Sequence, residues 1–229
     1  MSNVDVKIPY LDRLVSLGES DHIISFSRLG IAPVNILGVT IPEIRKLAKS
    51  IGQDYRAALL LFDTNIRDAQ ILAALICDPE LVDLSQMKNW ATKSTSWDVV
   101  DAVCMNLFWQ VRDLDKFIIY SYQSDKELVK RYAPVLMACQ LRYKPDMTQD
   151  QITRILNQTT PYLTDGRNYI KKAHSWVYRE LWKRHKVFQR DVEKFIIENY
   201  DSGNPVLRWI ARDIARKIKT LKKISKCVF

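Results

Sequence analysis

Hydrophobic residues recur at helical spacing along most of this 229-residue chain. The clearest segment begins at Thr40, where Thr40 and Glu43 form a capping-box pattern and Pro42 occupies the first turn. Apolar residues then follow at i, i+3, i+4 and i+7 until Gly52, a residue type that often ends a helix. This pattern predicts a helix between Thr40 and Gly52.

Similar helical segments continue toward the carboxyl end, joined by linkers of a few residues. They are predicted at about 54–62, 65–77, 84–92, 95–110, 113–123, 126–143, 148–160, 166–185, 188–200 and 204–222. Such short linkers make sequential helices antiparallel neighbours. We therefore expect an all-α fold, an α-solenoid or superhelix of stacked helix pairs with a concave face. Pro134 should kink its helix or end the first part of it.

The composition is that of a globular protein, with 47% hydrophobic and 27% charged residues. We expect one domain over residues 1–229, with 1–20 and 223–229 peripheral. No apolar run approaches the roughly 20 residues of a transmembrane helix, and the first ten residues do not resemble a signal peptide. The four cysteines show neither a CxxC pair nor a nearby histidine, which argues against structural zinc and disulfides. These features predict a cytoplasmic protein without a membrane segment.

Positive charge is concentrated near the carboxyl end. Residues 167–226 hold 17 Lys and Arg against 6 Asp and Glu, a net +11, whereas the remainder of the chain has a net −2. A basic block of this kind favours a polyanionic partner, and nucleic acid is the first candidate. Solubility is the alternative, and charge alone does not decide between them.

Trp97 and Asp101 share one face of a predicted helix because they are four residues apart. The apolar stripe that begins at Val100 lies roughly 90° around the helix from them. The pair should therefore flank the core, where a tryptophan and a carboxylate can meet a ligand. The alternative is a half-buried tryptophan with Asp98 or Asp101 paired to a neighbouring arginine.

A second group of candidates lies in the segment 166–185. Lys172, Trp176, Arg179 and Lys183 form a stripe on a face away from the predicted core stripe. A tryptophan within a basic stripe is typical of surfaces that grip a nucleic-acid backbone. A cation–π stack on a surface helix would explain the same pattern without a ligand.

Arg131 lies at the margin of an apolar stripe in the segment 126–143. It could hold a phosphate through two hydrogen bonds, or it could pair with an acid of a neighbouring helix. The three histidines show no metal-ligand spacing, and the sequence has neither a Ser/His/Asp arrangement nor a glycine-rich phosphate loop. Zinc-dependent hydrolysis and nucleotide hydrolysis are therefore disfavoured.

Four stretches in this order resemble the AlkD-like DNA alkylation repair family, alkylpurine DNA glycosylases that are built from HEAT-like helical repeats. The matching stretches are residues 37–45, 97–101, 129–131 and 169–179. Their order and approximate spacing cover about residues 25–215. The resemblance implies a superhelix of antiparallel HEAT-like helix pairs whose concave basic groove holds double-stranded DNA.

The resemblance also implies roles for individual residues. Asp101 would be the catalytic carboxylate that stabilises an oxocarbenium sugar and positions the attacking water. Trp97 and Trp176 would pack against the deoxyribose and backbone of the damaged nucleotide, which stays stacked instead of entering a pocket. Arg131 would hold a phosphate nearby. The further DNA-binding candidates are Lys172, Arg179, Lys183 and Arg45. No metal or cofactor is implied.

The sequence thus predicts a monofunctional glycosylase that excises cationic N3- or N7-alkylated purines from double-stranded DNA. We expect a monomer in the cytoplasm that is associated with DNA. One alternative is a catalytically inactive HEAT-like scaffold that binds branched or damaged DNA. Another is a protein-binding solenoid whose basic carboxyl-terminal part only improves solubility.

Overall fold

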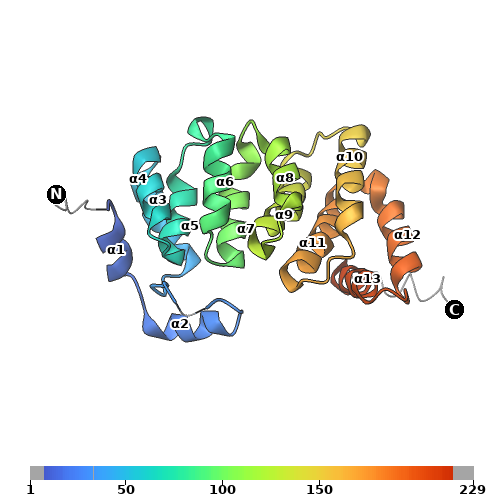
Figure 1. Ribbon diagram of the computed structural model, residues 1–229, viewed down its shortest axis with the longest axis horizontal. Helices are drawn as coiled ribbons and strands as arrows, with labels where there is room; N and C mark the ends of the chain where they lie inside the picture. Colours follow the sequence, from blue (N-terminus) through green and yellow to red (C-terminus); the bar gives the residue numbers. More distant parts are fainter. Residues whose placement is uncertain (1–7, 33, 219–229) are drawn as a thin grey trace. The chain divides into compact units, whose positions relative to one another are not determined.

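The computed structural model describes residues 8–32 and 34–218, and these residues contain α-helices and short 3-10 helices but no strands (Figure 1). The all-α prediction is confirmed for this part of the chain. The α-helices are α1 (Leu11–Ser16), α2 (Ser20–Ser27), α3 (Ile41–Ile51), α4 (Tyr55–Asp63), α5 (Arg67–Ile76), α6 (Leu84–Lys93), α7 (Trp97–Asn106), α8 (Leu114–Gln123), α9 (Glu127–Tyr143), α10 (Gln149–Thr159), α11 (Asn168–Arg184), α12 (Gln189–Asn199) and α13 (Pro205–Ile218).

Two compact units divide the chain between Phe117 and Ile118, within α8. The predicted superhelix with a concave groove concerns how these units lie together, and it stays a prediction. So does the prediction that residues 1–229 form one domain.

In the first unit, helices pack on their direct neighbour in the chain and on the next helix but one. α5 contacts both α3 and α7, while α4 packs against α5 and α6. The core between them is aromatic: Phe62 stacks on Trp90 with ring centroids 3.9 Å apart, and Phe117 meets Phe108 edge-on at 5.4 Å. All four rings are buried. Offset and edge-on ring pairs of this kind add to the stability that burial of apolar area provides.

The second unit repeats this alternate packing. α11 lies between α9 and α13, and α12 packs on both α11 and α13. Ring pairs again join the helices, with Tyr122 stacked on the half-buried Tyr162 at 4.0 Å and Tyr178 on the half-buried Phe195 at 4.3 Å. α11 is therefore the central helix of this unit, and its orientation fixes the side chains on its outer face.

The helix boundaries follow local sequence signals. Both halves of the Thr40–Glu43 capping box are formed, and Gly52 ends α3 with a φ of 78°. Pro134 does not end its helix, because α9 continues to Tyr143. The segment predicted at 95–110 is divided at Leu107, whose φ of −131° and ψ of −68° are not helical, and a 3-10 turn follows it. The last four residues of the segment predicted at 204–222 lie outside the described residues.

None of the helices in the described ranges is both long and apolar enough to cross a membrane. Cys77, Cys104 and Cys139 are buried, as expected for small apolar side chains, whereas Cys227 lies outside the described residues. Burial raises the pKa of the Cys77 thiol to about 12. This cysteine is therefore a thiol at neutral pH.

Candidate nucleic-acid interface and active site

Trp97 and Asp101 lie on one face of α7 and are both half-buried. Val100 and Val103, on the neighbouring face, are fully buried. The prediction that the tryptophan and the carboxylate flank the core is therefore confirmed. The Trp97 indole is fixed because its Nε1 donates a hydrogen bond to the carbonyl oxygen of Leu29 at 3.2 Å.

Asp98, the second acid of this turn, is engaged inside the protein. Its Oδ2 accepts hydrogen bonds from Nε and Nη2 of Arg67 at 2.8 and 2.6 Å. The sequence left open whether Asp98 or Asp101 pairs with a neighbouring arginine. The structure shows this ion pair at Asp98. Asp98 thus anchors the first turn of α7 to α5.

Arg67 belongs to a buried ion-pair network that sequence reasoning missed. Its Nη1 lies 3.1 Å from Oδ1 of Asp68, whose carboxylate accepts hydrogen bonds from the backbone amides of Leu37 and Val39 at 2.8 and 3.0 Å. The guanidinium also lies 4.4 Å from the centre of the Phe26 ring. The sequence could have indicated this network, because Arg67 and Asp68 are adjacent opposite charges in an otherwise apolar helical segment. Buried charges require partners. This network ties the start of α7 to α5 and to the loop before α3.

The outer face of α11 carries the second group of candidates. Its predicted core stripe is buried from Ile170 to Leu181, while Lys172 and Lys183 are exposed and Trp176 is half-buried. Nε1 of Trp176 donates a hydrogen bond to Oε1 of Glu180 at 3.0 Å. The predicted separation between a core stripe and a basic stripe is confirmed.

Glu180 is a buried acid that sequence reasoning did not select, although it lies one turn after Trp176. Its carboxylate also pairs with Arg184 at 2.7 Å and lies 3.7 Å from Arg142. Burial raises the pKa of Glu180, but the hydrogen bonds from Arg184 and Trp176 outweigh this effect, so the pKa is lowered. Glu180 is therefore charged at neutral pH and fixes the orientation of the Trp176 indole.

Arg179 and Arg131 are less accessible than a simple cationic stripe would require. Arg179 is half-buried, its Nε donates to the carbonyl oxygen of Ser175 at 3.2 Å, and burial lowers its pKa. Arg131 is 5% exposed, and its Nη1 donates to the carbonyl oxygen of Tyr169 at 2.5 Å. This contact joins α9 to α11 through a backbone carbonyl, and the alternative in which Arg131 pairs with an acid of a neighbouring helix stays a prediction. Its role as a phosphate ligand stays a prediction.

The candidate residues are divided between the two units. Trp97, Asp101 and the exposed Arg45 of α3 belong to the first unit, and the structure brings the first two together. The second unit holds Arg131 and the stripe on α11. A joint site that includes residues from both units stays a prediction.

His174, at the centre of the α11 motif, belongs to the core. It is fully buried, its Nε2 lies 3.4 Å from the Tyr122 hydroxyl, and burial lowers its pKa to about 4. A histidine that is neutral and inaccessible at pH 7 is a packing residue. Within the described ranges, no group of three His, Cys, Asp or Glu side chains could hold a metal ion.

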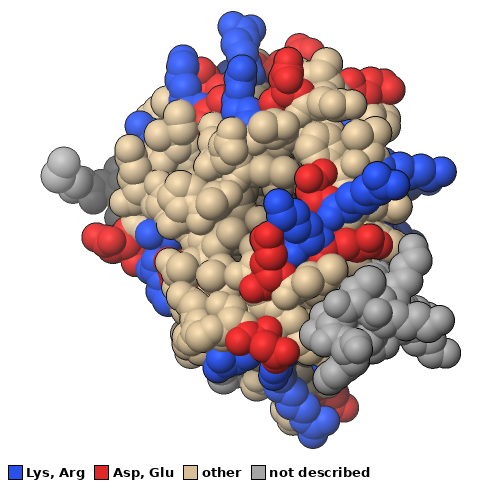
Figure 2. All heavy atoms as spheres, turned by 90° about the vertical axis from the view of Figure 1, so that its right-hand side faces the viewer, with Lys and Arg blue, Asp and Glu red and all other residues tan. Residues whose placement is uncertain are grey.

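The basic block is interrupted by acids at the surface. Figure 2 shows the side of the molecule on which α12 lies, where lysine and arginine side chains lie among aspartate and glutamate side chains. Four lysines of the block, at positions 219, 222, 223 and 226, lie outside the described residues. On the face shown, the positive excess is therefore not one continuous patch.

Comparison with known proteins agrees with this architecture. Residues 10–224 match the model of a family described as "DNA alkylation repair enzyme". The chain is also similar to a solved structure, described as "a new family of proteins related to the HEAT-like repeat DNA glycosylases with affinity for branched DNA structures". The TM-score is 0.72 at 16% sequence identity, covering 90% of this chain and 92% of the other. This likeness shows a HEAT-like repeat helical fold. No curated protein matches the chain significantly.

Proposed function

Because the chain belongs to the DNA alkylation repair enzyme family, we propose that it is a monofunctional DNA glycosylase acting on cationic N3- or N7-alkylated purines in double-stranded DNA. The observation that carries this proposal is the geometry of α7. Trp97 and Asp101 are half-buried on one face of this helix, at the edge of the core. We propose that Asp101 is the carboxylate that acts on the ligand because it shares this partly exposed face with Trp97.

The proposed reaction is hydrolysis of the N-glycosidic bond. The bond between the sugar C1′ and the purine breaks, and its electron pair neutralises the cationic base, which leaves without being protonated. The sugar becomes an oxocarbenium ion that the Asp101 carboxylate stabilises electrostatically. Water then adds to C1′ and gives one proton to the surrounding solvent, which leaves an abasic site. One carboxylate is sufficient for this sequence because the alkylated base needs no general acid.

DNA would be held mainly through its backbone. The Leu29 carbonyl orients the Trp97 indole, and Glu180 orients the Trp176 indole, each within its own unit. The exposed cations Lys172 and Lys183 would contact phosphates, with contributions proposed for Arg179, Arg131 and Arg45. Phosphate contacts carry no direct sequence information, so we expect lesion recognition without sequence preference.

The decisive experiment measures base release from a duplex that contains one N7-methylguanine. Wild-type protein should release free base and leave an abasic site, and Asp101→Asn should slow release by about 100-fold or more while DNA affinity is kept. Asp115→Asn is the matched control, since Asp115 is an exposed acid of α8 in the same unit. If the wild type releases no base above the buffer rate, the glycosylase proposal is wrong. Equal rates for Asp101→Asn and wild type would reject the role of Asp101.

The second candidate function is a catalytically inactive scaffold that binds branched or damaged DNA. The similar solved structure favours it, since that protein family is described as having affinity for branched DNA structures. Affinities for a four-way junction and for a linear duplex of equal length, measured at one salt concentration, separate the candidates. Tight junction binding without base release would support the scaffold.

A third possibility, a protein-binding solenoid, is tested by salt. DNA binding through phosphates predicts an affinity that falls steeply as salt rises, whereas an affinity unchanged by salt would favour a protein partner.

A further inference from the structure

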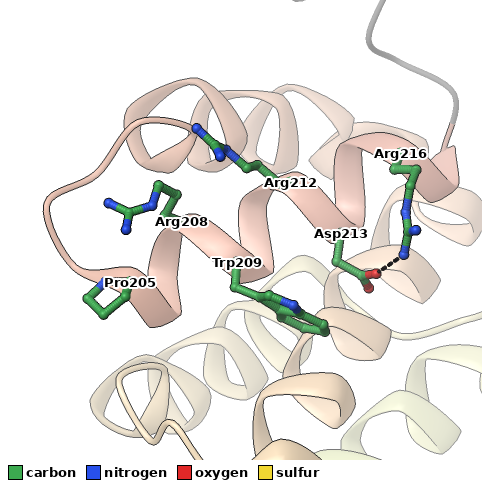
Figure 3. Close-up of a pocket in the computed structure, with 6 residues that line it drawn as sticks. All are labelled: Pro205, Arg208, Trp209, Arg212, Asp213 and Arg216. Atoms are coloured by element: carbon green, nitrogen blue, oxygen red, sulfur yellow. Dashed lines mark hydrogen bonds and ion pairs between the residues drawn. The ribbon is translucent and has the colours of Figure 1, made fainter.

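One face of α13 forms a pocket of about 350 Å³, lined by Pro205, Arg208, Trp209, Arg212, Asp213 and Arg216 (Figure 3). In Figure 3, Trp209 and Asp213 extend from α13 toward the helices drawn below it, while Arg208 and Arg212 extend from its other side. Arg212 there contacts Tyr200, which directly follows α12. The three arginines follow one another at intervals of four residues. Successive arginines are therefore about 6 Å apart along the helix axis.

Two contacts define how α13 lies against α11. Nζ of Lys171 lies 4.9 Å from the centre of the Trp209 indole, and Oγ of Ser175 donates a hydrogen bond to Oδ2 of Asp213 at 2.6 Å. Both contacts advance by four residues on each helix. The two helices therefore run in the same direction, with residues 171 and 175 facing 209 and 213.

This register places the basic residues of both helices on one side of the pair. Lys172 and Trp176 each follow a contact residue of α11 by one position, which turns them about 100° in one sense. Arg208 and Arg212 each precede a contact residue of α13 by one position, which turns them about 100° in the opposite sense. Opposite rotations on two facing parallel helices lead to the same side. The arginines of α13 thus flank the basic stripe of α11.

The one acid in the pocket is already neutralised. Asp213 is buried, and it pairs with Lys217 at 3.0 Å and with Arg216 at 2.9 Å, in addition to the Ser175 hydrogen bond. Burial raises the pKa of Asp213, but these partners outweigh it and the pKa is lowered. The acid therefore anchors α13 to α11 without leaving an uncompensated negative charge in the pocket.

The outer arginines are held by contacts that a phosphate can replace. Arg212 pairs with Asp201 at 2.7 Å, and both side chains are exposed, by 51% and 69%. Its Nε also donates to the Tyr200 carbonyl oxygen at 3.0 Å, and the guanidinium lies 5.2 Å from the centre of the Tyr200 ring. The ion pair is exposed and contributes roughly 0–1 kcal/mol, so a phosphate can replace Asp201 while the contacts with Tyr200 hold the guanidinium in place. The Arg216 side chain is 71% exposed, and when it turns to a phosphate, Lys217 and Ser175 still hold the Asp213 carboxylate. Nη1 of Arg208 donates to the Ser202 carbonyl oxygen at 2.6 Å.

We propose that Arg208, Arg212 and Arg216 form a second phosphate-binding row, which contacts the backbone of double-stranded DNA beside the α11 stripe. The proposal rests on the DNA binding of the proposed function, but not on base excision. Trp209, held under Lys171, forms the wall of the pocket and fixes the direction of the row. The ligand of the pocket is thus the phosphodiester backbone, bound without reference to sequence.

Salt titration of the full-length protein on an undamaged fluorescent duplex tests this row. Each phosphate contact that is lost lowers the log–log slope of affinity against salt by about 0.9. Arg212→Gln with Arg216→Gln should therefore lower the slope by about 1.8 and weaken binding at low salt. Lys194→Gln is the matched control, because this lysine of α12 is 74% exposed and pairs only at the surface with Glu198 in the same helix turn. It should leave the slope unchanged.

Two further sets of variants distinguish a lost phosphate contact from a folding defect, and the arginine row from the α11 stripe. Arg212→Lys with Arg216→Lys should restore the slope, since a lysine ammonium also neutralises a phosphate, whereas a fold defect would not be rescued. Lys172→Gln tests the α11 stripe in the same assay. If Lys172→Gln lowers the slope while the double glutamine variant does not, the second row is refuted and DNA binding stands. If wild-type affinity does not depend on salt, the row and the proposed function are both wrong. A lowered slope without base release would support the row and reject only the glycosylase.

Discussion

Replacing Arg67 by methionine should lower the free energy of unfolding by about 3 kcal/mol, because two buried carboxylates lose their common partner. The Arg67 side chain is 4% exposed, Asp68 is fully buried and Asp98 is 13% exposed. Methionine can keep the apolar contact of the arginine stem, so the expected loss is mainly electrostatic. The predicted effect concerns the network that fixes the first turn of α7.

The magnitude follows from the contacts. Removing one partner of a buried ion pair typically costs 3–5 kcal/mol. The carboxylate of Asp68 keeps the backbone amides of Leu37 and Val39, and Asp98 keeps the amide of Val99 at 3.1 Å. These remaining donors place the expected loss near the lower end of the range. Arg67→Lys should cost less, because it keeps the charge but cannot reach both carboxylates with a planar fork.

Urea denaturation of the wild type and variants measures this effect. Lys93→Met is the matched control, since Lys93 pairs with Asp63 at the same 2.8 Å but their side chains are 37% and 54% exposed. This variant should stay within about 0.5 kcal/mol of wild type. Adding Asp98→Asn to Arg67→Met should recover at least about 1 kcal/mol, because it removes one of the stranded charges.

Two results would contradict the reasoning. A loss below about 1 kcal/mol for Arg67→Met would mean that the carboxylates find other compensation after the arginine is removed. Additive effects of Arg67→Met and Asp98→Asn would mean that the two residues are not coupled, despite their contacts at 2.6 and 2.8 Å.

Three further predictions concern other buried polar groups. The pKa of His174 is lowered to about 4, so stability that is complete above pH 6.5 should fall by about 3 kcal/mol as pH drops toward 4, while His174→Gln should show a flatter pH profile in urea melts. Glu180→Gln should lower the free energy of unfolding by about 2 kcal/mol in urea melts. It should also broaden the emission spectrum of Trp176, obtained as the difference from the spectrum of Trp176→Phe. An unchanged emission spectrum would contradict the role of Glu180 in orienting Trp176. Thr40→Ala should cost about 1 kcal/mol, as measured by thermal melting, by removing the capping box with Glu43; a cost near zero would show that the cap is dispensable.

Local signals in the sequence were sufficient for most of the helices. Each helix from α3 to α13 was predicted because apolar spacing, caps and short linkers are encoded within a few residues of one another. α1 and α2 were not predicted, because α1 has only six residues and none of the residues of α2 is buried. Pro134 was expected to kink its helix or end the first part of it; α9 continues through it, so the helix does not end there, while the kink stays a prediction. Every residue from Arg131 to Leu141 is buried. Packing on both sides of Pro134 stabilises a helix that local preference alone disfavours.

In the candidate site, too, contacts within one helix could be predicted from the sequence, whereas contacts between distant residues could not. The angular positions of Trp97 and Asp101 on their helix predicted that both residues flank the core. The same reasoning could have identified Glu180 as the hydrogen-bond partner of Trp176, because the two residues are one turn apart. The partner of Asp98 could not be found in this way, because Arg67 is 31 residues distant in the sequence. Arg131 shows the same limit, since its partner Tyr169 lies 38 residues away.

The acids within the basic block clarify what its net charge means for DNA. Glu180 and Asp213 are both buried, and each is paired with more than one cation. Their charges lower the net charge of the block. They do not lower the electrostatic potential at its surface, where a phosphate would bind, to the same extent. Their effect is positional, because Glu180 orients Trp176 and Asp213 sets the register between α11 and α13. That register decides which cations share a face. A basic residue on α13 contributes to DNA binding by its position relative to Ser175 and Asp213, and net charge alone would not distinguish Arg212 from Lys194.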